Sequence, residues 1–182
     1  MTELEGVLGP ERVLGPERVR LDTAVANARQ YAEWNRVEGL SASPVLHFAF
    51  LACMDSRIDI FTMFGLAIGD AHVLRNAGGI VTDDAIRSLA ISQRMLGTRT
   101  IVIVQHTGCG LIGVDDDKFA ADLELETGAR PDWRAGGFDD VEESVRCSIR
   151  VLRASPFIPH SDRILGFVYD LERGELIEVD AG

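Results

Sequence analysis

The feature that most constrains the fold is a pair of continuous apolar runs, each followed at once by polar, chemically reactive residues. The first run is Val45–Ala52, which His47 alone interrupts, and the second is Thr100–Gln105, which is rich in β-branched residues. Runs of this length are typical of strands that are covered on both faces, as in a parallel sheet. Because parallel strands need crossover connections, the two runs predict an α/β fold.

The segments around these runs alternate between helical and extended patterns, as an α/β fold requires. We expect helices from Asp22 to about Glu38, over Ile60–Leu66, from Thr82 to Gly97, from Asp115 to Thr127 and over Val141–Leu152. Further strands are expected at Ala71–Leu74 and in a terminal hairpin formed by Ile164–Tyr169 and Glu175–Val179. We therefore predict a mostly parallel central β-sheet, of about four strands plus a C-terminal edge strand, flanked by helices.

A chain of 182 residues fits one domain. Its first twenty residues contain the sequence Val-Leu-Gly-Pro-Glu-Arg twice in succession, at Val7–Arg12 and Val13–Arg18. Glycine and proline in each copy interrupt any helix. We expect residues 1–20 to form a flexible N-terminal arm and residues 21–182 to form a single α/β domain. The alternative is an arm that lies on a partner subunit.

Charge and cysteine content exclude several classes of protein. A net charge of −11 argues against a nucleic-acid partner, which would require a basic face. Three cysteines do not indicate a disulfide framework, so the reducing cytoplasm is the predicted compartment. No apolar run approaches the ~18 residues that a membrane helix needs, and we expect no membrane association.

Two short polar motifs follow the two apolar runs. Cys53-Met54-Asp55-Ser56-Arg57 follows the first, and His106-Thr107-Gly108-Cys109-Gly110 follows the second. Open α/β sheets place their sites at the carboxyl ends of parallel strands, so we expect the motifs to meet. Two thiols and an imidazole are ligands that zinc takes, and a catalytic site leaves one further position for water or substrate. Cys53, His106 and Cys109 are therefore candidate Zn²⁺ ligands; the alternative is two buried structural thiols and a core histidine.

Asp55 has two possible roles beside such a metal. It can be a fourth ligand, which closes the site, or it can pair with Arg57 through a bidentate contact and leave the position to water. The first role allows a structural zinc site without turnover, and an ordinary salt bridge is a further alternative for the pair. Zinc-bound water ionises near pH ~7, and the resulting hydroxide suits attack on a small electrophilic carbon. A helix expected at Leu111 would favour the Cys109 thiolate.

With Arg75-Asn76-Ala77-Gly78-Gly79 between them, the two motifs resemble those of the β-class carbonic anhydrases in order and spacing, from about Val45 to Leu111. The resemblance implies Cys53, His106 and Cys109 as zinc ligands. It also implies that Asp55 and Arg57 form a gating dyad. Gly78 and Gly79 are expected to bring their backbone close to the metal and line the substrate pocket, to form the turn before the Thr82 helix, or to do both.

The resemblance also implies an activity and an assembly. The expected activity is reversible hydration of carbon dioxide to bicarbonate by zinc-bound hydroxide. The expected assembly is a homodimer or a dimer of dimers, with an N-terminal helix wrapped over the partner. Val45–Ala52 lacks the glutamine of plant-type members, so the chain resembles a shorter branch that is also similar to carbonyl sulfide hydrolases. Hydrolysis of carbonyl sulfide at the same site is one alternative, and a non-catalytic zinc-binding dimer is another.

Four further cysteine and histidine residues lie outside these motifs. Cys147 lies off the apolar stripe of its predicted helix, and we expect a free structural thiol there. His47 is expected to be a hydrogen-bonded core histidine. A proton-shuttle role stays open for His47, His72 and His160.

Overall fold

The structure, a computed structural model, describes residues 21–34 and 37–181, and the predicted arm of residues 1–20 lies outside the described residues. The chain divides into two compact units, residues 1–40 and 41–182. In the first unit, helix α1 spans Leu21–Trp34. Asp22 therefore lies inside this helix rather than capping it, and the helix ends before the predicted Glu38.

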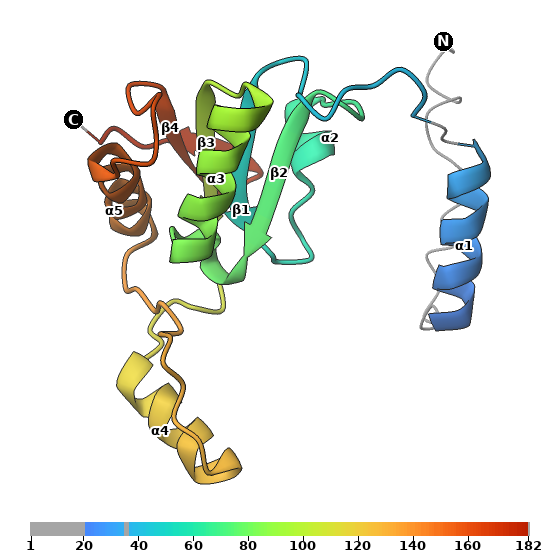
Figure 1. The fold of residues 1–182 in the computed structure, drawn as a ribbon. Coiled ribbons are helices and arrows are strands. Elements are labelled where there is room, and N and C mark those ends of the chain that lie inside the picture. Colours follow the sequence, from blue (N-terminus) through green and yellow to red (C-terminus); the bar gives the residue numbers. More distant parts are fainter. Residues whose placement is uncertain (1–20, 35–36, 182) are drawn as a thin grey trace. The chain divides into compact units, whose positions relative to one another are not determined.

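The second unit is built on a five-stranded sheet in the order β2-β1-β3-β4-β5 (Figure 1). Four strands are parallel, and the last pairs antiparallel with β4, which confirms the predicted α/β fold. The chain passes from β1 to β2 and then returns to β3 on the other side of β1, so the topological switch point lies between β1 and β3. The strands are β1 (Phe48–Cys53), β2 (Ala71–Asn76), β3 (Thr100–His106), β4 (Ile164–Asp170) and β5 (Glu175–Glu178).

Strand β1 begins later than the apolar run that predicted it. His47 has a φ of 57°, in the left-handed region, so extended geometry starts only at Phe48. The carbonyl of His47 accepts a hydrogen bond from the Arg99 amide, and its ring Nδ1 lies 2.9 Å from the Gly97 carbonyl oxygen. His47 is hydrogen-bonded as predicted, but its side chain is exposed, so its assignment to the core was wrong.

Helices cover both faces of the sheet. Helices α3 (Asp83–Leu96) and α5 (Val141–Ala154) pack on one face (Figure 1), and the short helix α2 (Ile60–Phe64) packs on the other. The Thr82 hydroxyl caps α3, and Asp59 caps α2, each by accepting backbone N–H bonds. No helix among the described residues is long and apolar enough to cross a membrane.

Helix α4 (Asp116–Thr127) buries none of its residues, and the loop that follows it is fixed to its first residue. Asp116 Oδ1 accepts the backbone N–H groups of Gly136 at 2.8 Å and Gly137 at 3.2 Å, and Oδ2 accepts from Arg134 Nε at 2.9 Å. A side chain at Gly137 would meet the Val114 carbonyl oxygen at 1.9 Å, so only glycine fits there.

This carboxylate makes stability depend on pH. Hydrogen bonds from the Gly137 amide, and then from Arg134, lower the pKa of Asp116, of which only 12% is exposed. Because the folded pKa lies below the unfolded value near ~4, the stabilisation is present above pH ~4 and is lost as pH falls through the folded pKa. We expect Asp116→Asn to lower the free energy of unfolding by about 1–2 kcal/mol at pH 7, and by progressively less below pH ~4.

Urea denaturation between pH 2.5 and 7 measures this difference. Asp122→Asn is the matched control, because Asp122 is half exposed and pairs with Lys118 on the same helix. Its cost should be small at every pH. A difference between wild type and Asp116→Asn that stays constant down to pH 2.5 would contradict the assignment.

Candidate metal centre

The carboxyl ends of β1 and β3 bring the three candidate ligands together. Cys53 is the last residue of β1, His106 is the last residue of the neighbouring β3, and Cys109 follows in the turn after β3. All three are buried, with exposed fractions of 4%, 0% and 7%. Their ligand atoms lie within 4.8 Å of one another. The two motifs thus meet at the carboxyl ends of parallel strands, as predicted, and the meeting point is the switch point of the sheet.

The spacing and chemistry of this group fit zinc. The sulfur atoms of Cys53 and Cys109 are 3.9 Å apart. Two thiolates on a tetrahedral ion with Zn–S bonds of about 2.3 Å would be separated by ~3.8 Å. Among the described residues, His106 Nε2 is buried without a hydrogen-bond partner. An unpaired nitrogen in this position is costly, and coordination of a metal would satisfy it.

The other nitrogen of His106 is fixed by the protein. Nδ1 lies 2.9 Å from the carbonyl oxygen of Thr107 and must donate to it, which leaves Nε2 as the nitrogen with a free lone pair. Thr107 is itself held by two bonds to the end of β4: its amide donates to the Tyr169 carbonyl, and its hydroxyl accepts from the Leu171 amide. Sequence reasoning missed this role of Thr107, because the partners are distant along the chain.

The two thiols differ in how readily they ionise. Burial raises the pKa of Cys53, but His106 and the backbone N–H groups of Asp55 and Gly78 lower it, and the result is about 7. Burial lowers the pKa of His106, while Cys53 and the Thr107 carbonyl raise it, with a net increase. Cys53 is therefore the thiol that ionises more readily.

Cys109 behaves in the opposite way. Burial raises the pKa of Cys109, which the Leu111 amide only partly offsets. The helix expected at Leu111 is not formed: this segment is a turn, and the next helix begins at Asp116. No helix N-terminus therefore supports the Cys109 thiolate, and the prediction of one was wrong.

Asp55 and Arg57 face each other across a turn rather than along a strand. Arg57 Nε donates to Asp55 Oδ1 at 2.9 Å, and Nη2 donates to Oδ2 at 2.7 Å. Nη2 also donates to the Gly108 carbonyl at 3.0 Å, which links the two motifs. These bonds from Arg57 hold the pKa of Asp55 well below its usual range. Asp55 Oδ2 lies only 3.7 Å from His106 Nε2, so the carboxylate borders the candidate ligands while Arg57 holds it.

Arg75 is a site residue whose specific role sequence reasoning missed. Its Nε and Nη2 donate to the Cys53 carbonyl at 2.9 and 2.8 Å, and Nη2 also donates to the Asp55 carbonyl. The guanidinium therefore fixes the backbone between a candidate ligand and its neighbouring carboxylate. The motif that contains Arg75 was noted, but nothing in its spacing showed this contact.

Gly78 and Gly79 place backbone directly against β1. Both have positive φ, 77° and 63°, and they form the turn that precedes α3. A Cβ at Gly79 would lie 2.6 Å from the Cys53 nitrogen and 2.9 Å from the Ala52 carbonyl carbon. The turn and the close approach to the candidate ligand Cys53 thus both occur.

Gly79→Ala is expected to be strongly destabilising, because the left-handed conformation and the contact with rigid backbone both penalise a side chain. We expect a loss of about 3 kcal/mol or more in the free energy of unfolding, measured by urea denaturation. Gly174→Ala is the matched control, since Gly174 has a φ of 69° and nothing within 4 Å of its Cβ position. It should cost only about 1–2 kcal/mol. Equal losses in the two variants would contradict the close approach.

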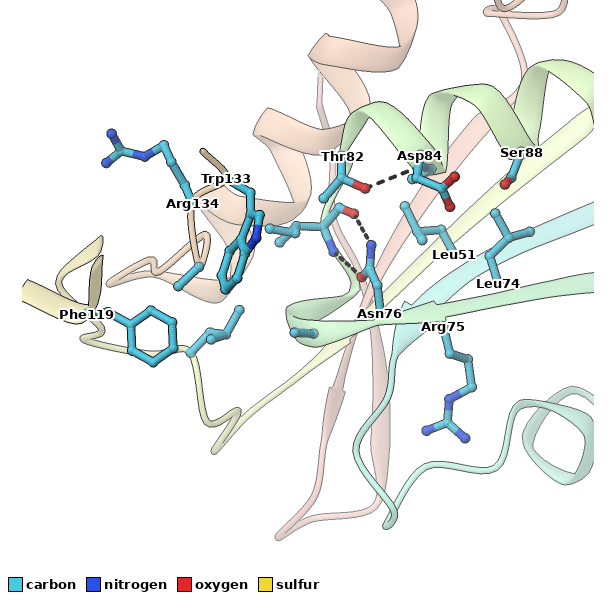
Figure 2. A pocket seen from close by; sticks show the side chains of 15 residues that line it. Leu51, Leu74, Arg75, Asn76, Thr82, Asp84, Ser88, Phe119, Trp133 and Arg134 are labelled. Atoms are coloured by element: carbon cyan, nitrogen blue, oxygen red, sulfur yellow. Dashed lines mark hydrogen bonds between the residues drawn. The ribbon is translucent and has the colours of Figure 1, made fainter. Parts of the chain in front are cut away.

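A hollow near this centre is a separate feature. Its volume is about 590 Å³, and none of the three candidate ligands lines it. Figure 2 shows Asn76 beneath it, whose side chain donates to the Ile80 carbonyl and accepts from the Ile80 amide. The labelled Arg75 points away from the hollow. The side chains of Phe119 and Trp133 line the opposite wall, with ring centroids 6.4 Å apart.

Comparisons with known proteins find relatives that match most of this chain. Residues 48–176 match the family model described as carbonic anhydrase. The β-carbonic anhydrase 1 of Mycobacterium bovis is 46% identical over 158 residues, which cover 87% of this chain and 96% of that protein. A carbon disulfide hydrolase of Acidithiobacillus thiooxidans is 38% identical over 151 residues, which cover 69% of each protein. The crystal structure of the carbonic anhydrase from Streptococcus mutans has a TM-score of 0.80 at 41% identity, covering 87% of this chain and 96% of that one.

Proposed function

Because this chain belongs to the β-carbonic anhydrase family, we propose that it binds Zn²⁺ through Cys53, His106 and Cys109 and reversibly hydrates carbon dioxide to bicarbonate. The observation that carries the proposal is the group of three buried ligand atoms within 4.8 Å of one another. The Asp55 carboxylate beside this group supports an active site rather than a closed structural one, since Arg57 engages both of its oxygens.

Zinc at this position would act as a Lewis acid and lower the pKa of a coordinated water from 15.7 to about 7. The side chains around this position would orient the water and accept its proton. Asp55 Oδ2, 3.7 Å from His106 Nε2, is placed to accept a proton or a hydrogen bond from the attacking water. Arg57 orients that carboxylate and keeps it from taking the fourth metal position. We expect the backbone of Gly78 and Gly79 to border the substrate pocket, because the Gly79 backbone packs against Cys53.

A second candidate is hydrolysis of a sulfur-containing heterocumulene. Relatives named carbon disulfide hydrolase, 38% identical in one case, favour this substrate class. Carbonyl sulfide, the alternative predicted from the sequence, belongs to the same class and would follow the same course. Water adds to the carbon and the carbon–sulfur bond breaks, so that carbonyl sulfide and water give carbon dioxide and hydrogen sulfide.

Two parallel assays on zinc-loaded protein distinguish the candidates. Stopped-flow measurement of proton release follows carbon dioxide hydration, and a sulfide assay follows hydrolysis of carbonyl sulfide and of carbon disulfide. We expect fast hydration without sulfide release. Sulfide release with slow hydration would favour the second candidate. Protein that binds zinc and is inactive in both assays from pH 6 to 9 would instead be the non-catalytic zinc-binding protein.

We also propose that the chain assembles as a homodimer or a dimer of dimers. Phe119, Leu125 and Trp133 are 40%, 88% and 57% exposed, and subunit interfaces commonly cover such side chains. Light scattering coupled to size-exclusion chromatography measures the mass. A monomer at micromolar concentration would contradict the proposal. The cytoplasm stays the predicted compartment.

A further inference from the structure

Gln105 is a polar residue in the fully buried centre of the sheet. It lies on β3 directly before His106 and has an exposed fraction of 0%. Its Nε2 donates to the Gly79 carbonyl oxygen at 3.3 Å. Its Oε1 has no hydrogen-bond partner among the described residues. A buried amide with an unpaired acceptor lowers the stability of the fold, whereas an apolar residue of the same size would not. The presence of glutamine here therefore needs a reason, and its hydrogen bond to Gly79 is the candidate.

That bond reaches the turn that touches Cys53. Gly79 packs its backbone against the Cys53 nitrogen, and the N–H group of Gly78, one residue earlier, helps to lower the pKa of the Cys53 thiol. Asn76 closes the ends of the turn through its two bonds with Ile80. Gln105 is the side chain that holds the middle of the turn, and the Gly79 carbonyl can accept only from the NH₂ of the amide.

We propose that Gln105 is a positioning residue of the metal centre. By holding the Gly79 carbonyl, it places the Gly78 N–H so that this group donates a hydrogen bond to the Cys53 sulfur. The inference rests on the proposed function in one respect, namely that Cys53 is a zinc ligand. Hydrogen bonds to a ligand atom orient the ligand and tune its metal, and their loss typically lowers metal affinity. Gln105 acts through Gly79 and Gly78, and touches neither the metal nor the substrate.

Gln105→Met tests the proposal, because methionine keeps the volume and removes the donor. Gln93→Met is the matched control: Gln93 is also a buried glutamine, 5% exposed, and its amide bonds the backbone of His160, away from the metal centre. Zinc affinity is measured by competition with a chromophoric chelator, and the absorption spectrum of the Co²⁺-substituted protein reports ligand geometry. We expect Gln105→Met to weaken zinc binding about 10- to 100-fold and to shift the cobalt bands, while Gln93→Met leaves both unchanged.

A purely structural role would lower the melting temperature of both variants and leave zinc affinity within twofold of wild type, which would overturn the proposal. A measurement on the wild-type protein needs no variant to fold. In the ¹¹³Cd-substituted protein, the Gly78 amide should show scalar coupling to the metal through the Cys53 sulfur, and absence of this coupling would also overturn the proposal. Failure of the proposed function looks different, since wild-type protein would then bind no zinc at Cys53 or would bind it without turnover.

Discussion

Replacing Cys53 by serine is expected to remove most of the bound zinc and to lower the rate of carbon dioxide hydration about a thousandfold or more. A neutral hydroxyl cannot replace a thiolate as a zinc ligand at neutral pH. Cys53 is also the thiol that ionises more readily, with a pKa of about 7. Its loss therefore removes the ligand that forms a thiolate most easily at neutral pH. Metal content after purification and stopped-flow rates measure the two effects.

Cys147→Ser is the control for this substitution. Cys147 is a free thiol like Cys53, but it is exposed on α5 and lies outside the ligand group. The control should keep the zinc content and the rate of the wild type. If Cys53→Ser retained one zinc per chain and its activity, or if Cys147→Ser lost either, the assignment of ligands would be wrong.

The local parts of the fold could be predicted because their signals lie within a few residues. Helix α3 is capped by Thr82 at its N-terminus and by Gly97 at its C-terminus, as expected, because a side-chain cap and a left-handed glycine act on their immediate neighbours. The two ligand motifs could be placed together for a similar reason. Each directly follows a strand of a parallel sheet, and the carboxyl ends of such strands share one edge.

The contacts that support the site could not be predicted, because each joins residues far apart in the sequence. Gln105 bonds Gly79 across 26 positions, and Thr107 bonds Leu171 across 64. No periodicity or spacing records such a pair. The turn at Asp55 could not be predicted from the motif either: β1 ends at Cys53, and a turn brings the carboxylate against Arg57.

Replacing Arg57 by alanine is expected to lower the hydration rate about 10- to 100-fold while zinc stays bound. Arg57 supplies three hydrogen bonds to Asp55, two of them from its guanidinium, and these two disappear in the variant. The carboxylate already lies 3.7 Å from His106 Nε2, so a small rotation then lets it act as a fourth ligand. The variant should therefore combine a normal zinc content with a closed site.

The Co²⁺-substituted protein reports this closure directly. Azide should shift the cobalt bands of the wild type and leave those of Arg57→Ala unchanged. Adding Asp55→Asn to Arg57→Ala should restore the response to azide but not the activity, because the carboxylate is then absent both as a ligand and as a proton acceptor. Arg87→Ala is the control, since Arg87 pairs with the exposed Asp84 at the surface. Wild-type rates in Arg57→Ala, or an azide response equal to that of the wild type, would show that Arg57 does not hold Asp55 away from the metal.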